Sequence, residues 1–182
     1  ADSGFHGTFS FKILQGSPTG ILSRKDCIVL TQSMAEKYFP GEDPVGKTLK
    51  VNNKYEYEIT GIILDPPSNS HLNFGGIISF STLYRGDRAK WMESWIGNIN
   101  YYTYFRTNGS INKPELEKLL NDKVVEKAGQ HFEDYGFSLN TRLQPLSDIH
   151  LRSDFEHDLQ SNGDIRYVYI MIVVGVVILI IA

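Results

Sequence analysis

The sequence is short of the residues that build disulfides, cysteine metal sites and nucleic-acid surfaces. Among 182 residues there is a single cysteine, Cys27, so the chain can form neither an internal disulfide nor a zinc site built from cysteines. The formal net charge is −3, and no run of Lys or Arg is longer than Arg24-Lys25. A nucleic-acid surface needs clustered positive charge to displace counterions. We therefore predict no nucleic-acid partner, and we expect Cys27 to be a small buried residue of an apolar strand.

Charge is also missing from the end of the chain, where the sixteen residues 167–182 carry none. They are apolar on every side of a helix, and a bilayer core of about 30 Å requires about 20 such residues. We expect residues 167–182 to be the start of a transmembrane helix and residues 161–166 to be a connector. A buried core helix or strand is the alternative, but Tyr167 and Tyr169 lie where an interfacial aromatic belt would begin, and an all-round apolar helix has no solvent face.

The polar body of the chain alternates strand and helix patterns, which predicts a mixed α+β fold. The predicted strands are residues 8–14, 27–30, 48–51, 55–64, 76–80, 101–106 and 137–143. The predicted helices are residues 32–39, with Thr31 as N-cap, residues 82–91, and a longest helix opened by Asn112-Lys113-Pro114. Asp65-Pro66-Pro67-Ser68-Asn69-Ser70 is the strongest break in the chain. We therefore expect one lobe of residues 1–70 plus 136–160, with residues 71–135 inserted as a second lobe.

Residues 41–48, Gly-Glu-Asp-Pro-Val-Gly-Lys-Thr, match the P-loop pattern G-x-x-x-x-G-K-[ST] letter for letter. A P-loop requires a strand before it, a helix after it and amide groups that face the phosphates. Here a predicted helix precedes the motif and a predicted strand follows it. Glu42 and Asp43 would repel phosphate, and Pro44 has no N–H group. We predict a helix-to-strand turn without bound nucleotide, which excludes a P-loop enzyme.

A group of potential metal ligands precedes the apolar tail, and it consists of His150, Asp154, Glu156, His157 and Asp158. Their spacing matches neither H-x-x-x-H nor H-E-x-x-H, so a solvated polar connector is the better interpretation. The other histidines are isolated from any thiol or serine nucleophile motif: His6, His71 and His131. We therefore predict no catalytic, cofactor-binding or metal-binding residue, no cofactor and no enzymatic activity.

Five segments taken together resemble a known family. They are residues 9–16, residues 28–39, residues 41–48, the triplet Asn69-Ser70-His71, and residues 143–151 followed by the apolar tail. In this order they resemble the periplasmic core domain of MacB/FtsX-type ABC transporter permeases, especially the versions common in Bacteroidetes. The likeness runs over nearly the whole chain. Each motif alone is weak, but the combination is specific.

The resemblance implies an extracytoplasmic domain between the first two transmembrane helices of a permease in the bacterial inner membrane, with residues 1–166 in the periplasm. It implies a porter-like α/β subdomain, here residues 1–70 plus 136–160, and an inserted sabre-like α/β subdomain, here residues 71–135. In this family a cytoplasmic ABC ATPase subunit hydrolyses ATP, and the membrane helices pass the motion to the periplasmic domain, which is called mechanotransmission.

Further partners implied by the resemblance are a second permease copy, a periplasmic adaptor, and a lipoprotein, peptide or drug cargo. The sequence departs from the family pattern because the first transmembrane helix, the start of the periplasmic domain and everything after the opening of the second helix are missing. A ligand-sensing extracytoplasmic domain of a membrane receptor is the competing interpretation. Sequence beyond Ala182 would separate the two, since further apolar spans favour a permease and a signalling module favours a receptor.

Overall fold

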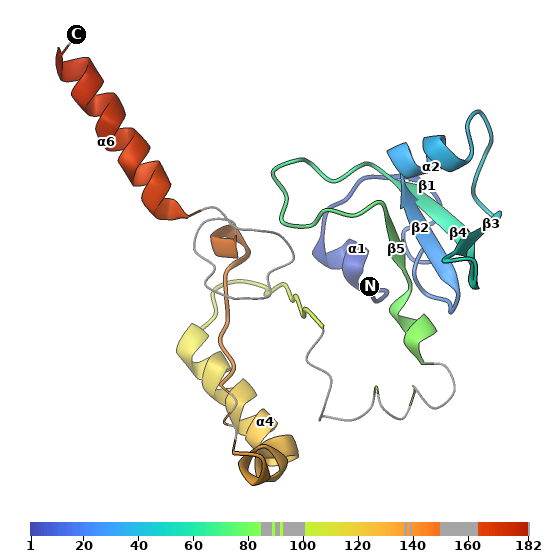
Figure 1. Ribbon diagram of the computed structural model, residues 1–182. Helices are drawn as coiled ribbons and strands as arrows, with labels where there is room; N and C mark the ends of the chain where they lie inside the picture. Colours follow the sequence, from blue (N-terminus) through green and yellow to red (C-terminus); the bar gives the residue numbers. More distant parts are fainter. Residues whose placement is uncertain are drawn as a thin grey trace. The chain divides into compact units, whose positions relative to one another are not determined.

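The computed structural model describes residues 1–84, 89, 92, 101–136, 138, 140–149 and 164–181 (Figure 1). The chain forms two compact units. One comprises Ala1–Pro67 with Phe74–Thr141, and the other comprises Ser68–Asn73 with Arg142–Ala182. Helices and a sheet occur together, so the predicted α+β class is confirmed. The division into a lobe of residues 1–70 plus 136–160 and an inserted lobe of residues 71–135 stays a prediction.

The first unit contains a five-stranded sheet built around its longest strand. The strands are β1 (Ile13–Gln15), β2 (Cys27–Thr31), β3 (Thr48–Val51), β4 (Tyr55–Ile63) and β5 (Gly76–Ile78). Their order is β1-β4-β2-β5, and β3 also pairs with β4. The pairing of β2 with β4 is parallel, whereas the other pairings are antiparallel. Four of the predicted strands are therefore confirmed, with ends that differ by at most a few residues.

The β3–β4 hairpin forms where the sequence predicts it, because its two turn residues adopt an unusual backbone conformation. Asn52 and Asn53 both have φ of 54°. Two consecutive left-handed residues are the mark of a type I′ turn, whose twist matches that of the flanking strands, and Asn tolerates this conformation better than most residues. In β4 the side chains of Tyr57 and Ile59 are buried while Glu56 and Glu58 are exposed, as the alternation predicts.

Helix α2 (Gln32–Tyr38) directly follows the fully buried strand β2, as expected. Its N-terminus is capped differently from the prediction. The Thr31 hydroxyl donates to the carbonyl of Gly75 at 3.2 Å, while the Asp65 carboxylate accepts the Ser33 amide at 3.2 Å and the Ser33 hydroxyl. The predicted Thr31 cap is thus wrong at the side chain, because a carboxylate 32 residues away satisfies the helix amide instead.

The sheet buries apolar side chains on both faces. One face presents Ile28, Leu30, Tyr57, Ile59 and Ile62, against which Ala35 of α2 packs. The other face presents Val29, Ile63 and Ile77, which contact Ile21, Leu22, Phe5 and Phe11. Cys27 is 1% exposed, and its thiol donates to the carbonyl of Arg24 at 3.0 Å. The expectation of a small buried strand residue is confirmed.

The predicted strand at residues 8–14 is largely wrong. Helix α1 (Phe5–Thr8) occupies its start, and only Ile13 and Leu14 of the range enter β1. The aromatic side chains between them pack on one another, since the Phe9 and Phe11 rings lie 5.0 and 5.6 Å from the Phe5 ring. The alternation of Phe residues therefore serves ring packing rather than a strand ladder.

Two later predictions also differ from the structure. A 3-10 helix, η1 (Phe80–Leu83), covers the start of the predicted helix 82–91, and most of the remainder lies outside the described residues. Residues 101–106 are described but form no strand. Two rings of this segment each pack on a ring elsewhere in the chain: Tyr101 lies edge-on to Phe80 at 5.2 Å, and Tyr104 lies edge-on to Phe9 at 5.1 Å. Aromatic contacts therefore take the place of strand hydrogen bonds.

The longest described helix, α4 (Lys113–Asp134), confirms the prediction from Asn112-Lys113-Pro114. Pro114 and Glu115 lie in its first turn, where a missing N–H and a negative charge are both favourable. Of the strand predicted at residues 137–143, Phe137 and Leu139 lie outside the described residues, and residues 140–143 are not part of a strand.

The second unit contains the 3-10 helix η2 (Leu146–Asp148) and the helix α6 (Ile165–Ile181). Helix α6 covers most of the predicted range 167–182, so its helical structure is confirmed. Among the residues that the structure describes, no helix combines the length and the apolarity needed to cross a membrane. The connector expected at residues 161–166 is described only from Asp164 onwards.

Candidate functional site

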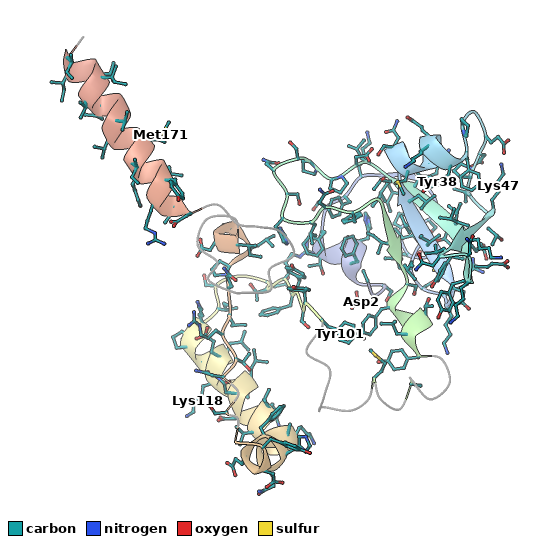
Figure 2. All side chains as sticks on the ribbon, in the orientation of Figure 1. Asp2, Tyr38, Lys47, Tyr101, Lys118 and Met171 are labelled. Carbon is teal, nitrogen blue, oxygen red and sulfur yellow. The ribbon has the colours of Figure 1, made fainter. Side chains whose placement is uncertain are left out.

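The motif at residues 41–48 lies between α2 and β3, as a helix-to-strand turn (Figure 2 labels its Lys47). Several of its amide groups have partners within the fold. The amide of Val45 donates to the Asp43 carboxylate at 3.0 Å, that of Gly46 to the carbonyl of Ile59 at 2.8 Å, and that of Lys47 to the carbonyl of Pro44 at 3.1 Å. Two of these amides, which a P-loop would direct at phosphate, close the turn on itself, and that of Gly46 holds it against β4.

The lysine of this motif is also engaged. The Lys47 ammonium pairs with the Glu42 carboxylate and lies 5.4 Å from the centre of the Phe39 ring. Its hydrogen bond lowers the pKa of Glu42, so this carboxylate stays charged beside the lysine at neutral pH. A nucleotide would have to displace that carboxylate. The position of the turn between a helix and a strand agrees with the sequence interpretation.

The second candidate group, His150, Asp154, Glu156, His157 and Asp158, lies outside the described residues. Within the described part of the chain, no three His, Cys, Asp or Glu side chains are arranged to hold a metal ion. The His131 ring packs 4.8 Å from the Tyr135 ring at the end of α4, an aromatic contact rather than a ligand pair.

A small hollow lies under α1 against the second face of the sheet. Apart from His6 its lining is apolar, with Phe5, Phe11, Val29 and Ile77 among the contributing residues. Ligand pockets combine an apolar wall with a few convergent polar groups that fix orientation. This hollow lacks the convergent polar groups, so its shape fits residual space in a core better than a substrate site.

The surface of α6 is the most unusual feature of the described chain. From Tyr167 to Ile181 its large apolar side chains are exposed on all sides, between 40% at Val168 and 79% at Leu179 (Figure 2 labels Met171 among them). Soluble domains normally bury such a surface or cover half of it. Helix α6 has 17 residues, and at a rise of 1.5 Å per residue its length is about 25 Å.

The polar start of α6 is built by two charged side chains. The Asp164 carboxylate accepts the amide of Arg166 at 2.8 Å and the guanidinium of the same residue at 2.8 and 3.1 Å. The amide hydrogen bond from Arg166 lowers the pKa of Asp164. A carboxylate at a helix N-terminus satisfies free amides and complements the helix dipole. The polar-to-apolar boundary of this segment therefore lies within one helical turn.

Sequence reasoning does not single out two side chains that join distant parts of the first unit. Asp65 caps α2, and Asn121 of α4 hydrogen-bonds to the backbone of Thr141. Their partners lie 32 and 20 residues away in sequence, so no local sequence pattern predicts these contacts. The preference of Asp for helix caps is the one signal that could have drawn attention to Asp65.

Comparisons with known proteins bear on these surfaces. The model of the MacB-like periplasmic core domain matches residues 1–123. The comparison with curated proteins yields no match. A solved domain of a protein described as a permease, from Porphyromonas gingivalis, has a TM-score of 0.61 and 20% identity, over 80% of this chain and 64% of that one.

The periplasmic region of MacB from Actinobacillus actinomycetemcomitans has a TM-score of 0.44 and 15% identity, over 76% of this chain and 64% of that one. The present chain thus spans just under two thirds of the length of each solved domain. The structure from Porphyromonas gingivalis shows a shared fold. The family match covers well over half of the sequence, including the whole sheet and the first half of α4. The chain belongs to the family of MacB-like periplasmic core domains.

Proposed function

We propose that this chain is the periplasmic part of an ABC transporter permease in a bacterial inner membrane, and that it does no chemistry itself. The observation that carries the proposal is α6. A domain of a periplasmic family here continues into a helix whose large apolar side chains are exposed from Tyr167 to Ile181. Such a surface fits hydrocarbon, where an apolar helix with internally satisfied backbone groups is stable.

The start of α6 supports placement at a bilayer. Tyr167 and Tyr169, which are mostly exposed, lie in the first two turns, and aromatic side chains at the end of a span favour the lipid headgroup region. Asp164 and Arg166 lie just before them and neutralise each other. The charged residues would stay in water on the periplasmic side, and the residues from Ile170 onwards would enter the hydrocarbon.

We further propose that the domain couples ATP hydrolysis by a cytoplasmic ABC ATPase to export or extraction of a substrate by mechanotransmission. A buried sheet with both faces packed is stiff enough to move as one body, and α6 provides a covalent path from the membrane. The turn at residues 41–48 uses its amides internally, which supports hydrolysis elsewhere. A second permease copy and a periplasmic adaptor or cargo are the partners that this role would require.

A flexible linker inserted before α6 tests this role in the whole permease with its ATPase partner. About eight Gly and Ser residues between Gly163 and Asp164 should break the mechanical path. Hydrogen exchange at residues 142–149 should respond to ATP with vanadate in the unmodified permease and should lose that response in the insertion variant. ATP hydrolysis should continue in both.

The same linker inserted at the exposed turn Asn108-Gly109 is the matched control, and it should leave the response at residues 142–149 unchanged. A response that survives insertion before α6 would contradict mechanotransmission. A chain that associates with no ATPase, and whose exchange never responds to nucleotide, would favour the receptor interpretation.

A further inference from the structure

Asn121 makes a two-sided contact with the segment that follows α4. Its Oδ1 accepts the amide hydrogen of Thr141, and its Nδ2 donates to the carbonyl of Thr141 at 3.2 Å. The same Nδ2 donates to Oδ1 of Asn140 at 3.1 Å. One carboxamide therefore satisfies both the donor and the acceptor of a single backbone residue, as a neighbouring strand would.

The surroundings of this contact favour a persistent interaction. The side chains of Asn121 and Thr141 are both half-buried, and partial shielding from water strengthens a hydrogen bond. Two other polar contacts of α4 stay inside the helix. Gln130 donates to Asp134 at 3.1 Å, and Lys123 pairs with Glu126. Asn121 instead ties the helix to a segment 20 residues further along the chain.

The position of the contact along the chain suits a mechanical role. Thr141 is the last residue of the first compact unit, and Arg142 begins the part that continues through η2 to α6. A displacement that passes from α6 along the backbone to residue 142 next reaches Thr141, which is hydrogen-bonded to Asn121. Through these hydrogen bonds Asn121 holds residues 140 and 141 to α4 in addition to the backbone connection.

We propose that Asn121 is a positioning residue that passes displacement from the α6 side of the chain into α4. The inference rests on the proposed function, because it presupposes that α6 moves with the nucleotide state of an ATPase. It adds the residue at which that movement enters the first unit. The Asn121 carboxamide fixes residues 140 and 141 to α4. A movement of residues 140 and 141 therefore moves α4 as well.

The contact itself is tested in the full 182-residue chain, held in detergent micelles. Asn121→Ala removes both sides of the contact, and Asn121→Asp keeps an acceptor for the Thr141 amide but loses the Nδ2 donor. Hydrogen exchange of the Thr141 amide should accelerate on the order of ten-fold in N121A and less in N121D. Gln130→Ala, which removes an amide side chain from the same helix, should leave it unchanged. Equal exchange in wild type and N121A would overturn the proposal.

The transmission is tested in the whole permease with its ATPase partner. Hydrogen exchange is followed at residues 142–149 and along α4, with and without ATP and vanadate. In the unmodified permease both segments should respond. In N121A the response should persist at residues 142–149 and fall at least several-fold in α4, whereas Q130A should retain both.

The outcomes separate this inference from the function on which it rests. If α4 responds fully in N121A, the role of Asn121 is wrong while mechanotransmission stands. If neither segment responds in the unmodified permease, the proposed function fails and takes this inference with it. Partial recovery of the α4 response in N121D, which keeps the acceptor, would distinguish the hydrogen bond to Thr141 from a general loss of helix stability.

Discussion

Strand β4 and helix α6 are both rich in isoleucine, yet they meet water in opposite ways. In β4 the side chain of Ile59 is 0% exposed, and Ile62 and Ile63 are also buried. In α6 the side chain of Ile180 is 78% exposed, and the apolar residues around it are exposed as well. The same residue type therefore lies in a complete core in one element and against solvent in the other.

This difference shows that an apolar stretch of sequence does not by itself determine which surroundings bury its side chains. β4 is covered within the unit, since β2 lies on one edge, β1 and β3 on the other, and α2 packs on one face. Helix α6 has apolar residues on all sides and no polar face to leave in water. Burial of apolar surface is the main stabilising contribution to folding, so α6 needs a cover that the rest of the chain does not supply in its described part.

The sharpest test of this contrast is the same substitution in both elements. Ile59→Ala should destabilise the first unit by about 3 kcal/mol, because it leaves a cavity in a packed core. Ile180→Ala should change the free energy of unfolding by much less, since its side chain has little packing to lose. Urea unfolding followed by circular dichroism measures both. Equal destabilisation would show that α6 packs into a core and would break the comparison.

The close fit of β4 to its neighbours can be tested at Gly16, which follows β1. Its φ is 99°, and an added Cβ would lie 2.6 Å from the carbonyl oxygen of Thr60 in β4. Gly16→Ala should therefore cost about 2–3 kcal/mol from strain and steric overlap.

Gly41→Ala is the matched control, because φ is 75° there but nothing lies within 4 Å of an added Cβ. It should cost about 1 kcal/mol, from the backbone conformation alone. The urea midpoints of Gly16→Ala and Gly41→Ala, each compared with wild type, measure the two losses of stability. A smaller loss at Gly16 than at Gly41 would mean that the backbone contact with β4 is not tight.

A smaller effect is expected at the cap that joins β4 to α2. Asp65→Ala removes the acceptor of the Ser33 amide and should cost about 1 kcal/mol at pH 7. The hydrogen bond from the Ser33 hydroxyl lowers the pKa of Asp65, so this contribution is present above the usual carboxyl pKa and is lost as pH falls through the lowered value.

The difference in urea midpoint between wild type and D65A should consequently begin to shrink below about pH 4, where the carboxyl of the unfolded chain takes up a proton. It should disappear once pH falls below the lowered pKa of the folded protein. A difference that stays constant down to pH 2 would contradict the charged cap. Asp43→Ala, which removes the acceptor for Val45 in an exposed turn, is a control for the general loss of an aspartate.

The smallest effect is expected at Lys47, the lysine of the P-loop-like sequence. Its ion pair with Glu42 is exposed, and exposed pairs contribute little, so Lys47→Ala should barely move the urea midpoint. Titration with ATP should show no saturable binding in either protein, since the amides of the turn are already engaged. Micromolar affinity that is lost in K47A would overturn this interpretation.

Local sequence patterns predicted the elements whose causes are local. The apolar run of β2, the Asn52-Asn53 turn, the Pro114 start of α4 and the uncharged α6 were all readable because neighbouring residues determine them. The failures have long-range causes. Phe9 and Phe11 alternate like a strand, but Phe9 packs on Tyr104 and Phe11 packs on Phe74, which both lie far along the chain.

The same limit applies to the candidate sites. The helix before residues 41–48 and the strand after them were predictable, and this context argues against a P-loop. The contacts of Asp65 and Asn121 were not, because each meets a partner that only the folded chain brings close. The two-lobe division and the role of α6 stay proposals that experiments on the whole permease must decide.

The most direct measurement is flotation of the full 182-residue chain with lipid vesicles, beside a chain that ends at Arg166. The account predicts that the full chain floats with the vesicles in high salt and needs detergent without them, while the shorter chain stays in the aqueous fraction. High salt removes electrostatic attraction, so flotation then reports apolar insertion of α6. A full-length chain that is monomeric in water and ignores the vesicles would contradict the account, because its apolar helix would then be covered by the protein itself.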